Sequence, residues 1–166
     1  MPKQKNRKAI IVLLDNIRST YNVGAIFRTA DAAGVGKIYL CGITPCPPCP
    51  KISKVALGAE NYVEWEHISS TWRLLEKLYQ TGYFIIALEQ SSKSKNIFKI
   101  RGFKRDKIAL ILGPEVKGLS SIILKRTALQ LEIPMEGKKE SLNVAVAFGI
   151  AIYQIKSVLF NKGNAI

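Results

Sequence analysis

Histidine, acidic residues and long apolar runs are all scarce in this chain of 166 residues. Its single histidine, His67, disfavours catalysis that relies on an imidazole as general acid or base. No stretch approaches the roughly 20 apolar residues that a membrane span requires. The short apolar run 9–14 ends at Asp15, which does not fit a signal peptide. We therefore expect a cytoplasmic protein with no membrane partner.

Cysteine is also rare, and its pattern argues against a disulfide framework. The three cysteines are Cys41, Cys46 and Cys49, an odd number in an apparently cytosolic chain. Cys46 and Cys49 have the spacing of a zinc knuckle or a redox pair, but zinc needs four ligands, and only Cys41 and His67 could complete the set. We expect free thiols in a stiff, proline-rich loop and no metal, with a metal-binding protein as a distant alternative.

Basic residues, by contrast, are abundant and unevenly placed. The formal net charge is +13 and the sequence pI is about 9.8. The first eight residues hold four basic side chains and no acidic one, and the segment 93–107 holds seven against Asp106 alone. Such segments can be solvated loops that keep a protein soluble. The alternative that we favour is a polyanionic partner such as RNA, because basic side chains release condensed counterions from phosphates.

Short apolar runs alternate with segments of helical pattern along the chain. Strands are predicted at 9–14, 37–41, 63–65, 83–88, 108–112 and 129–133, and helices at 22–33, 52–59, 71–79, 120–125 and 142–159. This alternation is typical of an α/β fold with a mostly parallel sheet flanked by helices. No repeat or linker divides the chain, so we expect one domain over 1–166 with a basic N-terminal tail at 1–8 and no separate RNA-binding domain.

Unusual residues follow three of the predicted strands, where α/β folds collect their ligands. Phosphate-binding motifs of the GxxxxGK[ST] and GxGxxG types are absent. Glu115 follows the strand 108–112, and its simpler interpretation is a carboxylate favoured by a helix dipole. Arg28 and Asn22 are six residues apart, so they point to different sides of their helix, and Arg28 could be an ordinary exposed arginine. Ser141 is predicted to cap the last helix.

The three loops together resemble one known family. The stretch Asn22–Val35 is similar to the first motif of the SpoU (TrmH-like) branch of the SPOUT RNA methyltransferases, Ile111–Leu119 to the second, and Ile133–Ala147 to the third. They occur in the family's order and the resemblance runs from about residue 10 to residue 157. It implies an α/β fold with a deep C-terminal trefoil knot, a rare exception among folds.

The resemblance also implies a cofactor, an assembly and a set of site residues. The cofactor is S-adenosyl-L-methionine, bound in a bent shape near Leu88, Glu89, Gly113, Ile133 and Leu142. The assembly is a homodimer with active-site parts gathered at its interface, to which the last helix would contribute. The catalytic positions are Asn22, Arg28, Glu115, Ser141 and Asn143.

The implied reaction moves a methyl group to a ribose 2′-hydroxyl of RNA. In this family the first-motif arginine is assigned as the base, but a guanidinium hardly ever loses its proton. Our hypothesis is that Arg28 anchors the target phosphate and stabilises the developing oxyanion. RNA contacts are expected at Lys93, Lys95, Arg101, Lys104 and Arg105. We favour tRNA over rRNA as the substrate, and keep base methylation and a catalytically silent RNA-binding module as alternatives.

Overall fold

The computed structural model describes residues 10–160, so the basic tail at 1–8 lies outside the described residues. Seven parallel-paired strands form one sheet in the order β3-β2-β1-β6-β4-β7-β5. In chain order the strands are β1 (Ile10–Asp15), β2 (Lys37–Cys41), β3 (Glu64–Ile68), β4 (Phe84–Leu88), β5 (Lys95–Asn96), β6 (Ile108–Leu112) and β7 (Leu129–Glu132). The predicted α/β fold with a mostly parallel sheet is confirmed.

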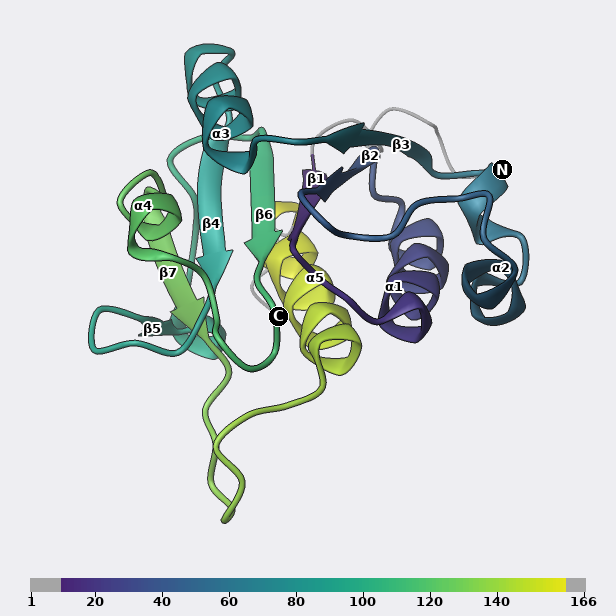
Figure 1. Ribbon diagram of the computed structural model, residues 1–166. Coiled ribbons are helices and arrows are strands. Elements are labelled where there is room, and N and C mark those ends of the chain that lie inside the picture. The colour runs from purple at the N-terminus through teal and green to yellow at the C-terminus, as the bar shows by residue number, and fades with distance from the viewer. Residues whose placement is uncertain (1–9, 161–166) are drawn as a thin grey trace.

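Helices cover both faces of this sheet (Figure 1). The helices α1 (Thr20–Ala33), α2 (Pro50–Ala56) and α5 (Val144–Phe160) pack on one face, and α3 (Thr71–Gln80) and α4 (Ser121–Leu124) on the other. Two short 3-10 helices, η2 (Ala59–Asn61) and η3 (Ile97–Lys99), complete the elements. No helix within 10–160 combines the length and apolarity that crossing a bilayer would take.

The central strands β1 and β6 are buried along their whole length because each faces helices on both sides. Val12 and Leu110 point into the core beneath α1 and α5, whereas Leu13 and Ile111 point toward α3 and α4. Successive side chains of a strand alternate between faces, so a continuous apolar run fills both cores. This explains why the two strands could be predicted from composition alone.

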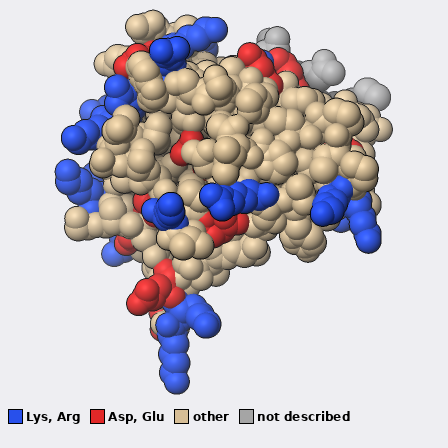
Figure 2. Space-filling view, in the orientation of Figure 1, with Lys and Arg blue, Asp and Glu red and all other residues tan. Residues whose placement is uncertain are grey.

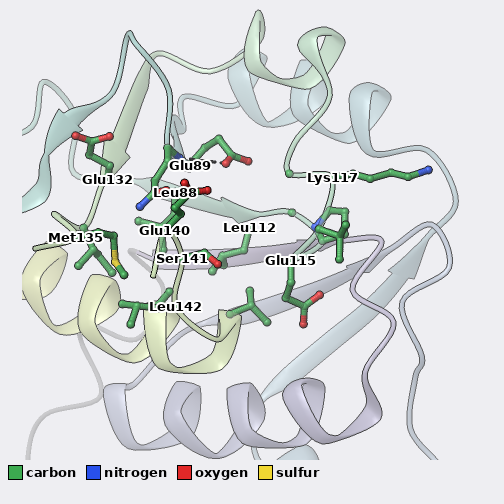
Figure 3. A pocket seen from close by; sticks show the side chains of 18 residues that line it. Leu88, Glu89, Leu112, Glu115, Lys117, Glu132, Met135, Glu140, Ser141 and Leu142 are labelled. Atoms are coloured by element: carbon green, nitrogen blue, oxygen red, sulfur yellow. Dashed lines mark hydrogen bonds between the residues drawn. The ribbon is translucent and has the colours of Figure 1, made fainter. Parts of the chain in front are cut away.

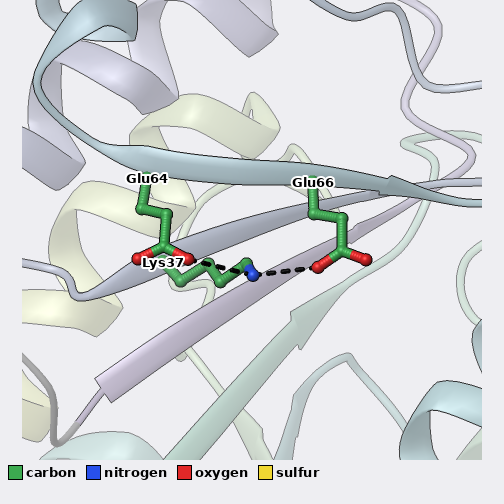
Figure 4. A network of polar contacts seen from close by, with 3 residues as sticks. All are labelled: Lys37, Glu64 and Glu66. Carbon is green, nitrogen blue, oxygen red and sulfur yellow. Dashed lines mark hydrogen bonds and ion pairs between the residues drawn. The ribbon is translucent and has the colours of Figure 1, made fainter.

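Charge adds to the backbone pairing that holds the outer strand β3, whose Trp65 and Ile68 also pack against the core. Its neighbour in β2, Lys37, lies 3.1 Å from Glu64 and 2.9 Å from Glu66 (Figure 4). Partial burial lowers the pKa of Lys37, but its hydrogen bonds to Glu66 and Glu64 outweigh burial and raise the net value. The same bond lowers the pKa of Glu66. The arrangement suits a strand with one open edge, which needs charged side chains to discourage pairing with other chains.

Several predicted element boundaries were wrong, and the fifth strand was missed. Helix α1 begins at Thr20 with Ser19 as its cap, two residues earlier than predicted. Helix α5 begins at Val144, two residues later than predicted. The predicted helix 52–59 is α2 followed by η2, and the strand predicted at 63–65 is Glu64–Ile68. Gly34 ends α1 in the left-handed conformation.

Candidate active site

A chain of hydrogen bonds joins one residue from each of the three motifs. The Asn22 side-chain amide donates to Oε1 of Glu115 over 2.5 Å. Asn143 donates from Nδ2 to Oδ1 of Asn22 over 3.0 Å. Asn22 is 5% exposed, so the central member is fixed by burial as well as by its partners. Three residues far apart in sequence therefore form one polar cluster.

Local capping interactions place both asparagines. Ser19 caps α1 by accepting from the Asn22 backbone N–H, which leaves the Asn22 side chain free for tertiary contacts. At α5, Oδ1 of Asn143 accepts from the backbone N–H groups of Ala145 and Val146 at 2.9 and 3.3 Å. The cap predicted at Ser141 is therefore wrong, because Asn143 fills that position. One side chain both starts the helix and orients the cluster.

Next to this cluster lies a pocket of about 370 Å³, at the carboxyl ends of β4, β6 and β7 (Figure 3). A volume of this order is in the range of small-molecule sites. The five residues predicted to bind the cofactor all line it: Leu88, Glu89, Gly113, Ile133 and Leu142. Glu115 and the exposed Ser141 line it as well. The sequence-predicted cofactor residues are thus brought together in one place.

Carboxylates dominate the charge of this pocket. Its lining includes Glu89, Glu115, Glu132 and Glu140 against a single cation, Lys117. The Lys117 side chain points away from the other labelled residues (Figure 3). The charge of this lining is therefore opposite in sign to the net charge of the chain, which is +13. The pocket therefore suits a ligand that carries positive charge beside an apolar part, which Leu112 and Leu142 would contact.

The loop after β6 is locked against the end of β4. Oε2 of Glu89 accepts from the Leu119 backbone N–H over 2.7 Å. A Cβ added at Gly118 would meet that oxygen at 2.6 Å, and Gly118 has a φ of +64°. A side chain here would thus break the contact and strain the backbone. Glu89 therefore shapes the wall of the pocket in addition to lining it.

The chain is similar to known proteins over nearly its whole length. Residues 9–153 match the model of the SpoU rRNA Methylase family. The chain belongs to the SpoU methylase family. The deep C-terminal knot predicted with the fold is a feature of that family.

Individual SpoU relatives agree with this assignment. The chain is 30% identical over 154 residues to the 23S rRNA (guanosine-2'-O-)-methyltransferase RlmB of Coxiella burnetii, covering 93% of this chain and 60% of the relative. An AdoMet-bound rRNA methyltransferase from Sinorhizobium meliloti is 28% identical with a TM-score of 0.84, covering 92% of this chain and 57% of that one. The chain spans about 60% of the length of several curated relatives that it matches.

One solved structure has nearly the same length as this SpoU chain. It concerns the 2-OH methylation of C/U34 on tRNA and is 29% identical with a TM-score of 0.80. The match covers 94% of this chain and 99% of that one.

Arg28, the arginine of the first SpoU motif, is not part of the polar cluster. It is exposed and lines a separate hollow of about 530 Å³ between α1 and α2. Lys51 and Lys54 share this hollow with Tyr21, and no acidic residue is among its lining residues. Sequence reasoning missed both lysines, although their spacing of three residues places them on one helix face. Three converging cations suit a phosphate group.

The predicted RNA-binding residues do not form a single patch around the pocket. Lys95 lies in β5 beside Leu131, at the carboxyl end of β7, and Lys93 precedes it. The segment then crosses to the opposite end of the sheet, where Phe103 contacts Phe84 at the start of β4. There the Arg105 guanidinium lies 5.7 Å from the Tyr79 ring. Lys93 and Lys95 are thus near the pocket, while Lys104 and Arg105 follow the far part of the segment.

Basic side chains also gather along one side of the molecule, beside α3 and α4 (Figure 2).

The three cysteines line neither the cofactor pocket nor the hollow beside Arg28. Cys41 is buried, Cys46 and Cys49 are half-buried, and all three are free thiols. Among residues 10–160, no group of three or more His, Cys, Asp or Glu side chains is arranged to hold a metal ion.

Proposed function

We propose that this protein transfers a methyl group from S-adenosyl-L-methionine to a ribose 2′-hydroxyl of RNA. The observation that carries the proposal is the Glu115–Asn22–Asn143 cluster beside the acid-lined pocket. The cofactor carries a sulfonium and an ammonium group, which match the carboxylates, and an adenine, which matches the apolar lining. Bound there, it would supply a methyl group that is already activated for transfer.

The residues of the chain then have to align the ribose and assist its deprotonation. Glu115 is held by Asn22 with one oxygen occupied, so its remaining oxygen can accept from the ribose. Ser141 lies at the pocket wall, where its hydroxyl can contact the cofactor or the ribose. Arg28, with Lys51 and Lys54, would hold the phosphate of the target nucleotide.

We also propose a homodimer in which Arg28 of one subunit serves the pocket of the other. Within one chain Arg28 and Glu115 line different hollows, so a single subunit does not bring them together. A mixing experiment tests this directly. Arg28→Ala and Glu115→Ala proteins, each inactive alone, should regain activity when combined, because the heterodimer contains one intact site. If both residues acted within one subunit, mixing would restore nothing.

tRNA is the favoured substrate, supported by the relative of matching length that concerns tRNA 2-OH methylation. The similarity to a 23S rRNA guanosine-2'-O-methyltransferase keeps rRNA as the alternative. The first test is calorimetric titration with S-adenosylmethionine, followed by methyl transfer to total tRNA and mass spectrometry of the nucleosides. We expect a 2′-O-methylnucleoside that Arg28→Ala no longer makes and Arg28→Lys makes poorly. A methylated base would overturn the ribose assignment, and absence of cofactor binding would overturn the proposal.

A further inference from the structure

A third hollow, distinct from the cofactor pocket and from the hollow beside Arg28, lies on the other side of the loop Pro114–Gly118 from the cofactor pocket. We name it the α3 pocket, because the start of α3 forms part of its wall. Its volume is about 930 Å³. The loop residues, Glu115 included, line both hollows. The remaining lining residues come from the ends of β1, β2 and β3 and from α3 and α4: Asp15, Asn16, Arg18, Ile43, Ser69, Ser70, Thr71, Trp72, Ser120, Ile122 and Ile123.

Large apolar side chains are exposed around the α3 pocket. Ile43, Trp72, Val116 and Ile122 have exposed fractions between 39% and 96%. They come from four separate segments and converge on one hollow. Clustered apolar exposure of this kind marks a binding surface more often than isolated exposed residues do.

A buried carboxylate lies in the same pocket. Asp15 is only 6% exposed. Its Oδ1 accepts from the Thr71 hydroxyl over 2.5 Å and from the Asn16 side chain over 3.3 Å. Within residues 10–160, no group donates to Oδ2 and no cation pairs with Asp15. Oδ2 is not one of the fully buried oxygens without a partner, so it is open to the pocket and can accept from a ligand with an N–H group.

Two cations complete the lining. Arg18 and Lys117 belong to the pocket, and neither forms an ion pair with a described residue. The pocket thus offers an acceptor, an apolar surface and positive charge. These three features match the amino edge, the ring face and the phosphate of a nucleotide in single-stranded RNA.

We propose that the α3 pocket binds an unpaired nucleotide of the RNA substrate whose base carries an exocyclic amino group, which donates to Asp15. Carboxylates accept from the cytosine amino group in this way, whereas uracil presents a carbonyl oxygen at that position. This inference rests on the proposed RNA function and adds a base-reading site to it. The shared loop would place this nucleotide next to the one that is methylated.

The test compares binding of fluorescein-labelled C8 and U8 RNA oligonucleotides by anisotropy, without cofactor. We expect the wild-type protein to bind C8 roughly tenfold more tightly than U8. Asp15→Asn keeps the shape and an oxygen for Thr71 but presents an amide donor, so the preference should disappear or reverse toward U8. Trp72→Ala should weaken both RNAs equally, whereas Tyr62→Ala, an exposed aromatic outside the pocket, should change neither.

Equal wild-type affinity for C8 and U8 would overturn the pocket assignment and leave the RNA function standing. Failure to bind either RNA would overturn both. If Asp15→Asn unfolded, the Trp72→Ala and Tyr62→Ala pair would still decide whether the pocket contacts RNA. Sedimentation of the Trp72→Glu variant tests whether something other than RNA occupies the pocket. If this substitution converted a dimer to a monomer, the pocket would be assigned to contact with a second copy of the chain.

Discussion

Asn22 uses both ends of its amide, since Nδ2 donates to Glu115 and Oδ1 accepts from Asn143. This polarity fixes the orientation of the amide group. It also makes Glu115 an acceptor in the cluster. The Asn22 side chain thus connects the start of α5, through Asn143, to the loop after β6, through Glu115. Changes at Asn143 should therefore reach Glu115 through Asn22.

Substitution Asn143→Asp separates the two roles of that residue. The carboxylate still caps α5 by accepting from Ala145 and Val146, but it has no N–H to give to Asn22. We expect stability to change by less than about 1 kcal/mol while methyl transfer falls on the order of 100-fold. Thermal unfolding and transfer assays check this. Asn143→Ala should lose stability as well, and equal losses of stability in both variants would contradict the separation.

The thiol of Cys41 is predicted to be inert. Burial raises the pKa of this thiol to about 12, and the residue is fully buried. Because the pKa is raised, the thiol is protonated at pH 8 and only about one molecule in 10⁴ carries the reactive thiolate. Iodoacetamide at pH 8 should therefore label Cys46 and Cys49 of the native protein long before Cys41. Peptide mass spectrometry measures this, with labelling in denaturant as the control, and rapid native labelling of Cys41 would refute it.

At the scale of elements, the ion pairs of Lys37 add to the backbone pairing of the outer strand β3 with β2. Lys37→Met keeps an unbranched apolar stem but removes the charge, and we expect it to cost about 1 kcal/mol or less per pair. The folded-state pKa of Glu66 is lowered, so its contribution is present above about pH 4.5 and is lost as the pH falls. The difference between wild type and variant in urea unfolding should shrink from pH 7 to pH 3. A constant difference would show that packing, not charge, is responsible.

The elements that could be predicted from sequence are those whose signal is local. Strand β6 is a run of five buried apolar residues, and its predicted bounds were correct. Strand β5 has only two residues and exists because Lys95 and Asn96 pair with β7, a contact that no local pattern reveals. The start of α5 was misplaced because Ser141 and Asn143 are both good caps, and only the contact with Asn22 favours Asn143.

The site shows the same division between local and tertiary information. The motifs identified Asn22, Glu115 and Asn143, and the structure joins them. The basic segment 93–107 is continuous in sequence but crosses from one end of the sheet to the other, so its charges separate. Lys51 and Lys54 are distant from Arg28 in sequence, yet the packing of α2 on α1 brings them beside it. Charge counts along the chain cannot report such placements.

At the scale of the whole molecule, α5 is a predominantly apolar helix. Its 17 residues include one charged side chain, Lys156, which donates to the Ala33 carbonyl at the end of α1. Helices with this composition are normally buried on all sides. One face of α5 packs into the core through Phe148 and Ile152, but Val146 and Tyr153 are each 53% exposed. The exposed face is therefore the expected contact of the proposed homodimer.

The double substitution Val146→Glu/Tyr153→Glu tests this contact. Two carboxylates in each subunit would meet across a symmetric interface, where unpaired buried charge is strongly unfavourable. We expect sedimentation equilibrium to show a dimer for the wild type and a folded monomer for the variant. Methyl transfer should fall with dissociation, because Arg28 would no longer reach the partner's pocket. Tyr79→Glu, an equally exposed tyrosine on α3, should remain a dimer. A wild-type monomer with full activity would refute both the interface and the sharing of Arg28, since each subunit would then have to assemble its site alone.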